Sequence, residues 1–154
     1  MEEAIAQLRA GESRPLPSGL AVAQGVFYVG TGVWPLVHLR SFEAVTGPKP
    51  EGWLVKTVGA LIAVVGGALL LAGLRRRVSP ELRLLAAGSA ASLAAVDVIY
   101  SPQRISPVYL LDAVAEGVLI AGWCVSAARD WKLRGPQPPP PQYTSPEDAA
   151  GFPT

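Results

Sequence analysis

The stretch YLLDAVAEGVLIAGW, which runs from Tyr109 to Trp123, places two acidic residues inside an otherwise apolar segment. It lacks the alternation of polar and apolar residues that marks a half-buried strand. Extended to residues 108–127, it is about long enough for a helix to cross a ~30 Å hydrocarbon layer at ~1.5 Å per residue. The carboxyl groups of Asp112 and Glu116 are therefore predicted to lie within a membrane.

Three more apolar stretches precede this one, so the chain is predicted to be an all-α, integral membrane four-helix bundle. Only 16% of its 154 residues are charged, against roughly 25% in soluble domains. The transmembrane domain is predicted to cover residues 19–127, between a cytoplasmic N-terminal segment and a disordered, Pro-rich cytoplasmic tail. The predicted spans are 19–39, 53–74, 84–100 and 108–127, and the flanking segments are 1–18 and 128–154.

The composition excludes several kinds of function. The net charge of +1 lacks the basic excess of a nucleic-acid-binding protein. The single histidine, His38, cannot form a multi-histidine metal site, and the single cysteine, Cys124, cannot form an internal disulfide. Since no cofactor motif is present either, we expect no nucleic-acid partner, no metal and no cofactor.

The lysines and arginines predict the orientation, because cytoplasmic loops carry an excess of them. With both termini inside, nine of the 13 lie on the cytoplasmic side, and the triplet Arg75, Arg76 and Arg77 falls in one short loop. The abundance of Ala, Gly and Pro, with more Arg than Lys, is typical of a GC-rich bacterial genome. We therefore predict a multi-pass protein of the bacterial inner membrane with N-in/C-in topology.

This topology brings the polar residues of all four spans to the outer half of the bundle. A charge at the centre of a bilayer costs at least ~2.5 kcal/mol, so several at one depth favour a shared polar cluster. Tyr109, Asp112 and Glu116 recur at three- and four-residue steps along one face of the last helix. The candidate residues of the cluster are Gln24, Tyr28, Thr31, His38, Lys56, Asp97, Tyr109, Asp112 and Glu116.

These residues also have structural interpretations. Lys56 can pair with a carboxylate, or its ammonium can extend to the membrane interface. Asp97 can cap its helix or pair with Arg104. Asp112 and Glu116 fit an ion-pair network with Lys56 as well as they fit a binding site, and a lone histidine is more often interfacial than a ligand.

Small residues and tryptophans add predictions about packing. Small residues four positions apart let helix backbones approach closely in lipid, and we expect them to pack within the bundle rather than between two copies of the chain. They are Gly59, Ala63 and Gly67, then Ala86, Ala90 and Ala94, and finally Ala113, Gly117 and Ala121. Tryptophans near span ends are typical of interface anchors, and here these are Trp34, Trp53, Trp123 and Trp131.

Three stretches carry a resemblance to known proteins: GVFYVGTGVWPL, SFEAVTGPKPEGWLVKTVG and VYLLDAVAEG. Over roughly residues 19–127 the chain resembles small uncharacterised bacterial four-span membrane proteins, and its layout distantly resembles that of DoxX-type proteins. DoxX-type proteins usually carry a lysine soon after the glycine of the first helix, whereas this chain continues from Gly32 to His38. The resemblance implies the topology and supplies no activity.

Three functions fit these patterns. We favour an accessory or structural subunit of a membrane assembly, in which the polar groups satisfy one another or a partner subunit. The alternative is a protein that binds a small amphiphile or cation, such as a lipid, quinone or amine, in an outer-leaflet polar pocket. A carboxylate pair acting as acid and base in an intramembrane enzyme is the third, although no fuller catalytic constellation accompanies it.

Overall fold

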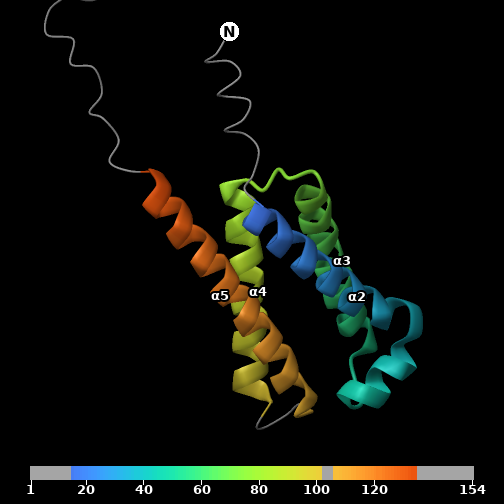
Figure 1. The fold of residues 1–154 in the computed structure, drawn as a ribbon. Coiled ribbons are helices and arrows are strands. Elements are labelled where there is room, and N and C mark those ends of the chain that lie inside the picture. The colour runs from blue at the N-terminus through green and yellow to red at the C-terminus, as the bar shows by residue number, and fades with distance from the viewer. Residues whose placement is uncertain (1–14, 102–105, 135–154) are drawn as a thin grey trace, which may run out of the picture.

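The computed structural model describes residues 15–101 and 106–134, which form four helices (Figure 1). All four are long and apolar enough to cross a membrane, and no strand occurs in the described residues, which confirms the all-α four-helix prediction. The predictions for the N-terminal segment up to residue 14, for Arg104 and for the tail beyond residue 134 lie outside this part of the chain. The helices are α2 (Pro15–Thr46), α3 (Gly52–Leu74), α4 (Pro80–Tyr100) and α5 (Val108–Arg134).

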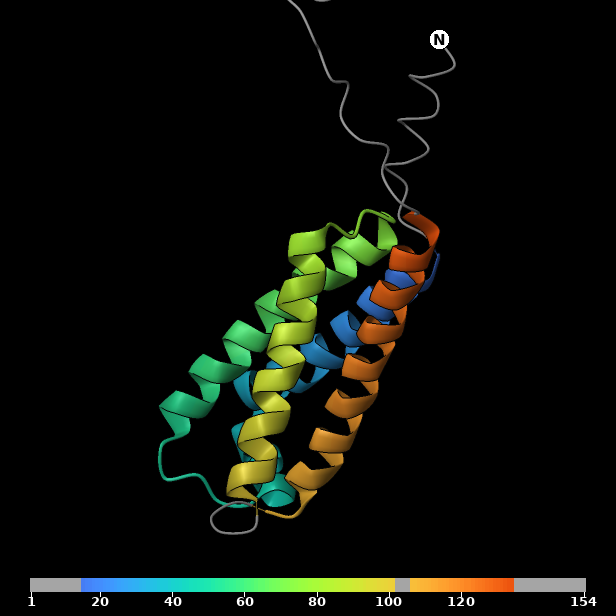
Figure 2. The ribbon, with the colours of Figure 1, turned by 90° about the vertical axis from the view of Figure 1, so that its left-hand side faces the viewer.

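The helices form two hairpins, α2 with α3 and α4 with α5. The partners pack closely within each hairpin, whereas α3 barely touches α4, and α2 meets α5 over a shorter stretch. Figures 1 and 2 show that α2 begins and α5 ends at the same end of the bundle. We call this the terminal end, and we call the opposite end, where α4 is followed by α5, the far end.

Glycines bring the backbones of α2 and α3 into contact. A Cβ built on Gly32 would stand 2.5 Å from the carbonyl oxygen of Gly59, and one built on Gly73 would stand 2.8 Å from that of Ser18. No larger side chain fits at these positions unless the backbone moves. The facing pairs along this seam are Ser18 with Gly73, Gly25 with Gly66, and Gly32 with Gly59.

The predicted four-residue repeats match this packing only in part. On α3, Gly59 lies in the seam, but a Cβ on Gly67 would meet nothing within 4 Å, because the contacts recur every seven residues. On α4, Ala86 and Ala90 are buried as predicted. On α5 the prediction is wrong, since Gly117 is exposed and has open space where its Cβ would be.

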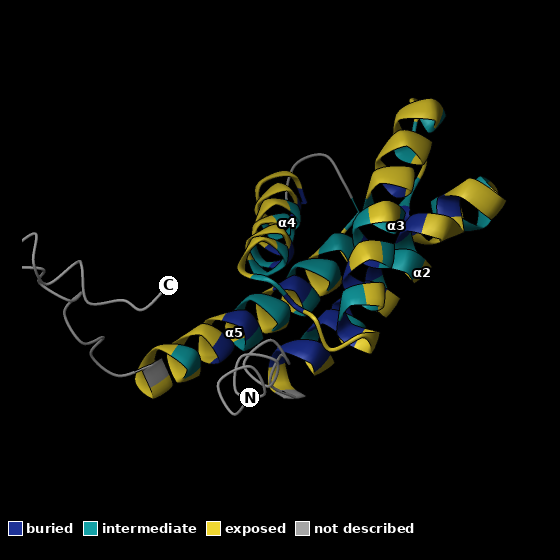
Figure 3. Ribbon diagram, turned by 90° about the horizontal axis from the view of Figure 1, so that it is seen from above, coloured by how far each residue is buried: buried dark blue, intermediate teal, exposed yellow. Residues whose placement is uncertain are grey.

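The buried core lies toward the terminal end. It contains Ala21, Leu69, Val78, Ala86 and Trp123, which come from the starts of α2 and α4, the later turns of α3 and α5, and the α3–α4 connection. Trp123 is only 4% exposed, so the prediction that it anchors the membrane interface is wrong. Figure 3 shows buried residues on the faces that the helices turn toward one another, and exposed ones on the outer faces.

Two polar contacts join helices in this half of the bundle. The side chain of Gln24 on α2 donates from Nε2 to the carbonyl of Ala86 (2.9 Å) and accepts at Oε1 from Nε1 of Trp123 (2.7 Å). Gln24 therefore connects α2 with both α4 and α5. Arg83 and Asp130 form a salt bridge between α4 and α5.

Helix α2 changes direction at His38, where φ is −145° and ψ is 76°. Pro35, one turn earlier, lacks the N–H that a continuous helix would use. After the kink, His38 caps the segment 39–46: its Nδ1 accepts from the backbone N–H of Ser41 (3.1 Å), and its carbonyl accepts from Ser41 Oγ (3.0 Å). We call residues 39–46 the return helix, because they turn back across the far end (Figures 1 and 2).

Helix α3 ends with a left-handed residue. Arg76 has φ of 53°, and its N–H donates to the carbonyl of Gly73 (3.0 Å), while the N–H of Arg77 donates to that of Ala72 (2.9 Å). This pair of bonds is the Schellman arrangement, in which glycine usually occupies the left-handed position. The sharp stop lets the chain enter α4 at Pro80, four residues before the predicted start of that span.

Candidate functional site

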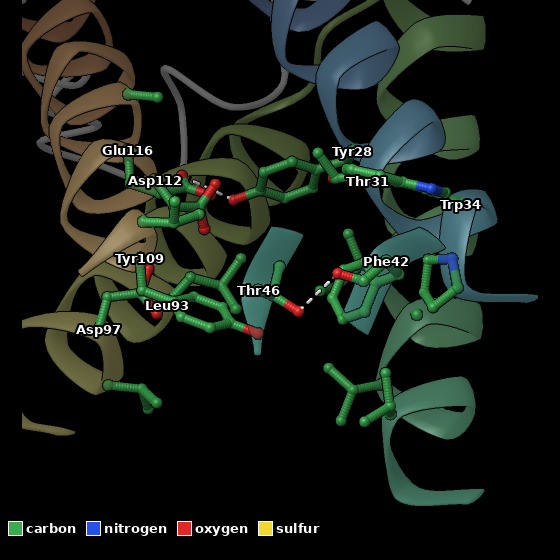
Figure 4. Close-up of a pocket in the computed structure, with 18 of the residues that line it drawn as sticks. Tyr28, Thr31, Trp34, Phe42, Thr46, Leu93, Asp97, Tyr109, Asp112 and Glu116 are labelled. Atoms are coloured by element: carbon green, nitrogen blue, oxygen red, sulfur yellow. Dashed lines mark hydrogen bonds between the residues drawn. The ribbon is translucent and has the colours of Figure 1, made fainter. Parts of the chain in front are cut away.

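A cavity of about 530 Å³ lies at the far end, between the two hairpins (Figure 4). Residues from all four helices line it, and its volume is within the ~300–1,000 Å³ that is usual for small-molecule pockets. Most of the lining is apolar or aromatic, including Phe27, Phe42, Leu54, Ile62, Leu93 and Val96. The two halves of the bundle thus differ, with a packed core toward the terminal end and a hollow at the far end.

Six of the nine candidate polar residues line this cavity, and they come from α2, α4 and α5. The residues that helical spacing placed on one face of α5 therefore do line one side of the cavity. Their role in ligand binding stays a prediction. The six are Tyr28, Thr31, Asp97, Tyr109, Asp112 and Glu116.

The other three candidates lie elsewhere. Gln24 is fully buried one turn away from Tyr28, where its amide connects three helices. His38 is exposed and caps the return helix. Lys56 is exposed on α3 and does not line the cavity, so the structure does not bring its ammonium to the acidic residues.

Three carboxyl groups form the acidic wall of the cavity, which we define as Asp97 on α4 and Asp112 and Glu116 on α5. Glu116 has no exposed surface, and its Oε2 accepts a hydrogen bond from the hydroxyl of Tyr28 (2.9 Å). Within residues 15–101 and 106–134, its Oε1 has no hydrogen-bond partner, and neither has Oδ2 of Asp97, a residue that is 5% exposed. The carboxyl groups of Asp97 and Asp112 lie close enough to interact electrostatically.

The return helix brings residues that the sequence analysis did not assign to the site. Phe42 and Thr46 line the cavity, and the Thr46 hydroxyl donates to the carbonyl of Phe42 (2.9 Å; Figure 4). The first predicted span ended at residue 39, which left both residues in a loop. Pro35 was the available signal for a break, but a proline does not indicate where the following chain goes.

Lys49 lies beside the cavity, just after the return helix. Its Nζ stands 5.0 Å from the centroid of the Tyr109 ring and donates to the carbonyl of Thr46 (2.8 Å). Burial lowers the pKa of Lys49 below its ordinary value, and the carboxylate of Glu43 opposes that shift. The ammonium of Lys49 thus interacts with other groups of the protein. Lys49 lies next to the cavity but is not one of its lining residues.

The lining combines an acidic wall with the hydroxyl groups of tyrosine and threonine side chains. Among the described residues that line the cavity are three carboxyl groups and no Lys, Arg or His. No group of three or more His, Cys, Asp or Glu side chains in the described ranges is arranged to hold a metal ion. A ligand that fits would bring hydrogen-bond donors to one wall and apolar surface to the others.

Comparison with known proteins finds no matching protein-family model, no similar curated protein and no similar solved structure. The resemblance to DoxX-type proteins therefore stays a prediction.

Proposed function

We propose that this multi-pass membrane protein binds a small amphiphilic molecule in the cavity at the far end. The observation that carries the proposal is the cavity itself, a hollow of about 530 Å³ with apolar walls and one acidic wall, inside a bundle of membrane-length helices. Lipid-soluble molecules with a polar head match both kinds of surface.

The proposed location is the inner membrane of a bacterium, with both termini in the cytoplasm. The excess of arginine and lysine at the terminal end, including Arg75, Arg76 and Arg77, supports that orientation. The cavity would then open within the outer leaflet, where its ligand would be a lipid-phase molecule.

Native mass spectrometry of the full chain, released from a mild detergent, tests this function. We expect the mass of the chain plus a few hundred daltons, because an occupied cavity of this size retains a ligand of that order. Leu93→Trp, which fills the cavity, should remove the extra mass, whereas Leu61→Trp on the exposed face of α3 should keep it. A bare chain mass, together with no stabilisation by any added amphiphile, would contradict the proposal.

A second candidate function is an accessory subunit of a membrane assembly. It is favoured by the exposed face of α5, where Gly117 leaves open space that a helix of another protein could approach closely. In that case the same spectra would show a larger complex. Gly117→Leu, which does not alter the cavity lining, should dissociate the complex while any bound small molecule stays.

A further inference from the structure

We infer that the ligand of the far-end cavity carries a protonated amine, whose N–H groups donate to the carboxyl oxygens of Glu116 and Asp97. This inference rests on the proposed function and names the chemical class of the ligand. It starts from two buried oxygen atoms to which no described residue donates a hydrogen bond.

Glu116 is the first of these two residues. The phenol of Tyr28 holds one carboxyl oxygen at 2.9 Å, and the other oxygen, Oε1, is buried without a hydrogen-bond partner among the described residues. Glu116 itself belongs to the lining of the cavity. Leaving a buried polar atom unpaired costs about 1–3 kcal/mol, and more for a charged one. A donor that reaches Oε1 from the cavity would remove that cost.

Asp97 repeats the arrangement on the neighbouring helix. Its Oδ2 is buried without a hydrogen-bond partner in the part of the chain that the structure describes, and the carboxyl group of Asp112 lies close enough to interact with it. Like charges at such close range repel each other unless a positive charge lies between them or a proton is shared. A cationic head group in contact with the acidic wall would do two things: it would reduce that repulsion, and it would supply the missing hydrogen-bond donor.

Lys49 and Lys56, the lysines that the structure describes at this end of the bundle, do not take this role. Lys49 directs its ammonium to the carbonyl of Thr46 and to the ring of Tyr109, and Lys56 is exposed on α3. Neither belongs to the described lining. Since no basic side chain of the described residues lines the acidic wall, the matching positive charge in this inference is that of the ligand.

The rest of the lining also suits an amine with an apolar tail. Aromatic rings attract cations through their faces, and those of Phe27, Tyr28, Trp34, Phe42 and Tyr109 all line the cavity. Away from the acidic wall, the side chains of Leu54, Val58 and Ile62 on α3 offer a surface for a hydrocarbon chain. The head would lie against α4 and α5, and the tail would lie against α3.

The test compares four amphiphiles with the same twelve-carbon chain: dodecylamine, dodecyltrimethylammonium, dodecanol and dodecanoate. Each is added at equal mole fraction to the full chain in a neutral detergent, and the midpoint temperature of unfolding is measured. We expect a saturable rise with dodecylamine and smaller rises with dodecanol and the trimethylammonium compound. The last of these has the charge but lacks an N–H donor. Dodecanoate should give no rise, because its charge is repelled.

Glu116→Gln keeps the acceptor for Tyr28 and removes the charge. It should weaken dodecylamine binding at least about tenfold while leaving dodecanol binding little changed. Glu51→Gln is the matched control, since Glu51 is exposed and lies outside the lining. If Glu116→Gln does not fold, Asp97→Asn provides the same comparison.

The outcomes separate this inference from the proposed function. Equal binding of dodecanol and dodecylamine, unaffected by Glu116→Gln, would overturn the amine and leave an amphiphile-binding protein. Preferential binding of dodecanoate would overturn it too, and equal binding of the trimethylammonium compound would overturn the assignment of an N–H donor. If none of the four compounds stabilises the protein and it carries no native ligand, the proposed function itself fails.

Discussion

A Cβ built on Gly25 would stand 2.8 Å from the carbonyl oxygen of Gly66 on the facing helix. It would also stand 2.6 Å from the backbone nitrogen of Leu70. Real Cβ atoms do not come this near to backbone atoms, so the main chains of α2 and α3 are in direct contact here. The seam depends on the absence of a side chain rather than on the presence of one.

Gly25→Ala should therefore destabilise the protein by about 1–3 kcal/mol, the usual cost of forcing extra volume into a packed interior. The matched control is Gly30→Ala on the same helix, where a Cβ would meet nothing within 4 Å. That change should be neutral or stabilising by up to ~1 kcal/mol, because alanine favours a helix more than glycine does. Unfolding in mixed micelles by a denaturing detergent measures both, and equal effects would contradict the seam.

Trp123→Phe should destabilise the protein by about 1–3 kcal/mol, because it leaves the buried Oε1 of Gln24 without its donor. Trp131→Phe, at a site that is 83% exposed, should change the free energy of unfolding by less than ~0.5 kcal/mol. Adding Gln24→Leu to Trp123→Phe removes both partners. The double variant should therefore lose less than the sum of the single variants, and strict additivity would show that the two side chains do not interact.

His38→Ala should destabilise the far end by about 0.5–2 kcal/mol, since the backbone N–H of Ser41 loses the acceptor that caps the return helix. His38→Asn should retain most of the stability, because asparagine is a preferred cap. Unfolding midpoints of the three proteins measure this order. The asparagine variant should still bind amphiphiles. If it does not, the imidazole of His38 takes part in ligand binding after all.

Arg76→Gly should stabilise the protein by about 1 kcal/mol. The reason is that φ of 53° strains any residue with a Cβ, whereas glycine adopts it freely. Any contribution that the contacts of the arginine side chain make to stability reduces this gain. Arg75→Gly removes the same charge at φ of −79°, where glycine brings no relief. Unfolding of the two variants should therefore show a gain only at position 76, and a gain at both would point to charge rather than backbone strain.

The sequence was sufficient for the number and type of the helices, because apolar length alone reports how much chain can cross a bilayer. Helical spacing also placed Tyr109, Asp112 and Glu116 on one face, and all three line the cavity. Such spacing is a local property, which a helix preserves whatever surrounds it.

Properties that depend on a distant partner were missed. Trp123 fits the statistics of interface anchors, and only the fold reveals that Gln24, 99 residues earlier in the chain, accepts its N–H. Gly59, Ala63 and Gly67 form as good a pattern as Gly59, Gly66 and Gly73, and only the facing helix selects the second. The sequence also did not predict the direction of the chain after Pro35. The residues that the return helix contributes to the cavity were therefore missed.

The seven-residue spacing of the seam raises a question of register. If α3 slid along α2 by one repeat, Gly32 would meet Gly66 and Gly25 would meet Gly73, so small residues would still face small residues. Such a slide displaces the helices by about 10.5 Å, and the connection between them would have to span the difference. That connection is tied down by the cap at His38 and by the turn at Gly47, where φ is 87° and the N–H donates to the carbonyl of Glu43 (2.8 Å). The glycines allow α2 and α3 to pack closely in either alignment. The short connection between the helices therefore determines which alignment the chain adopts.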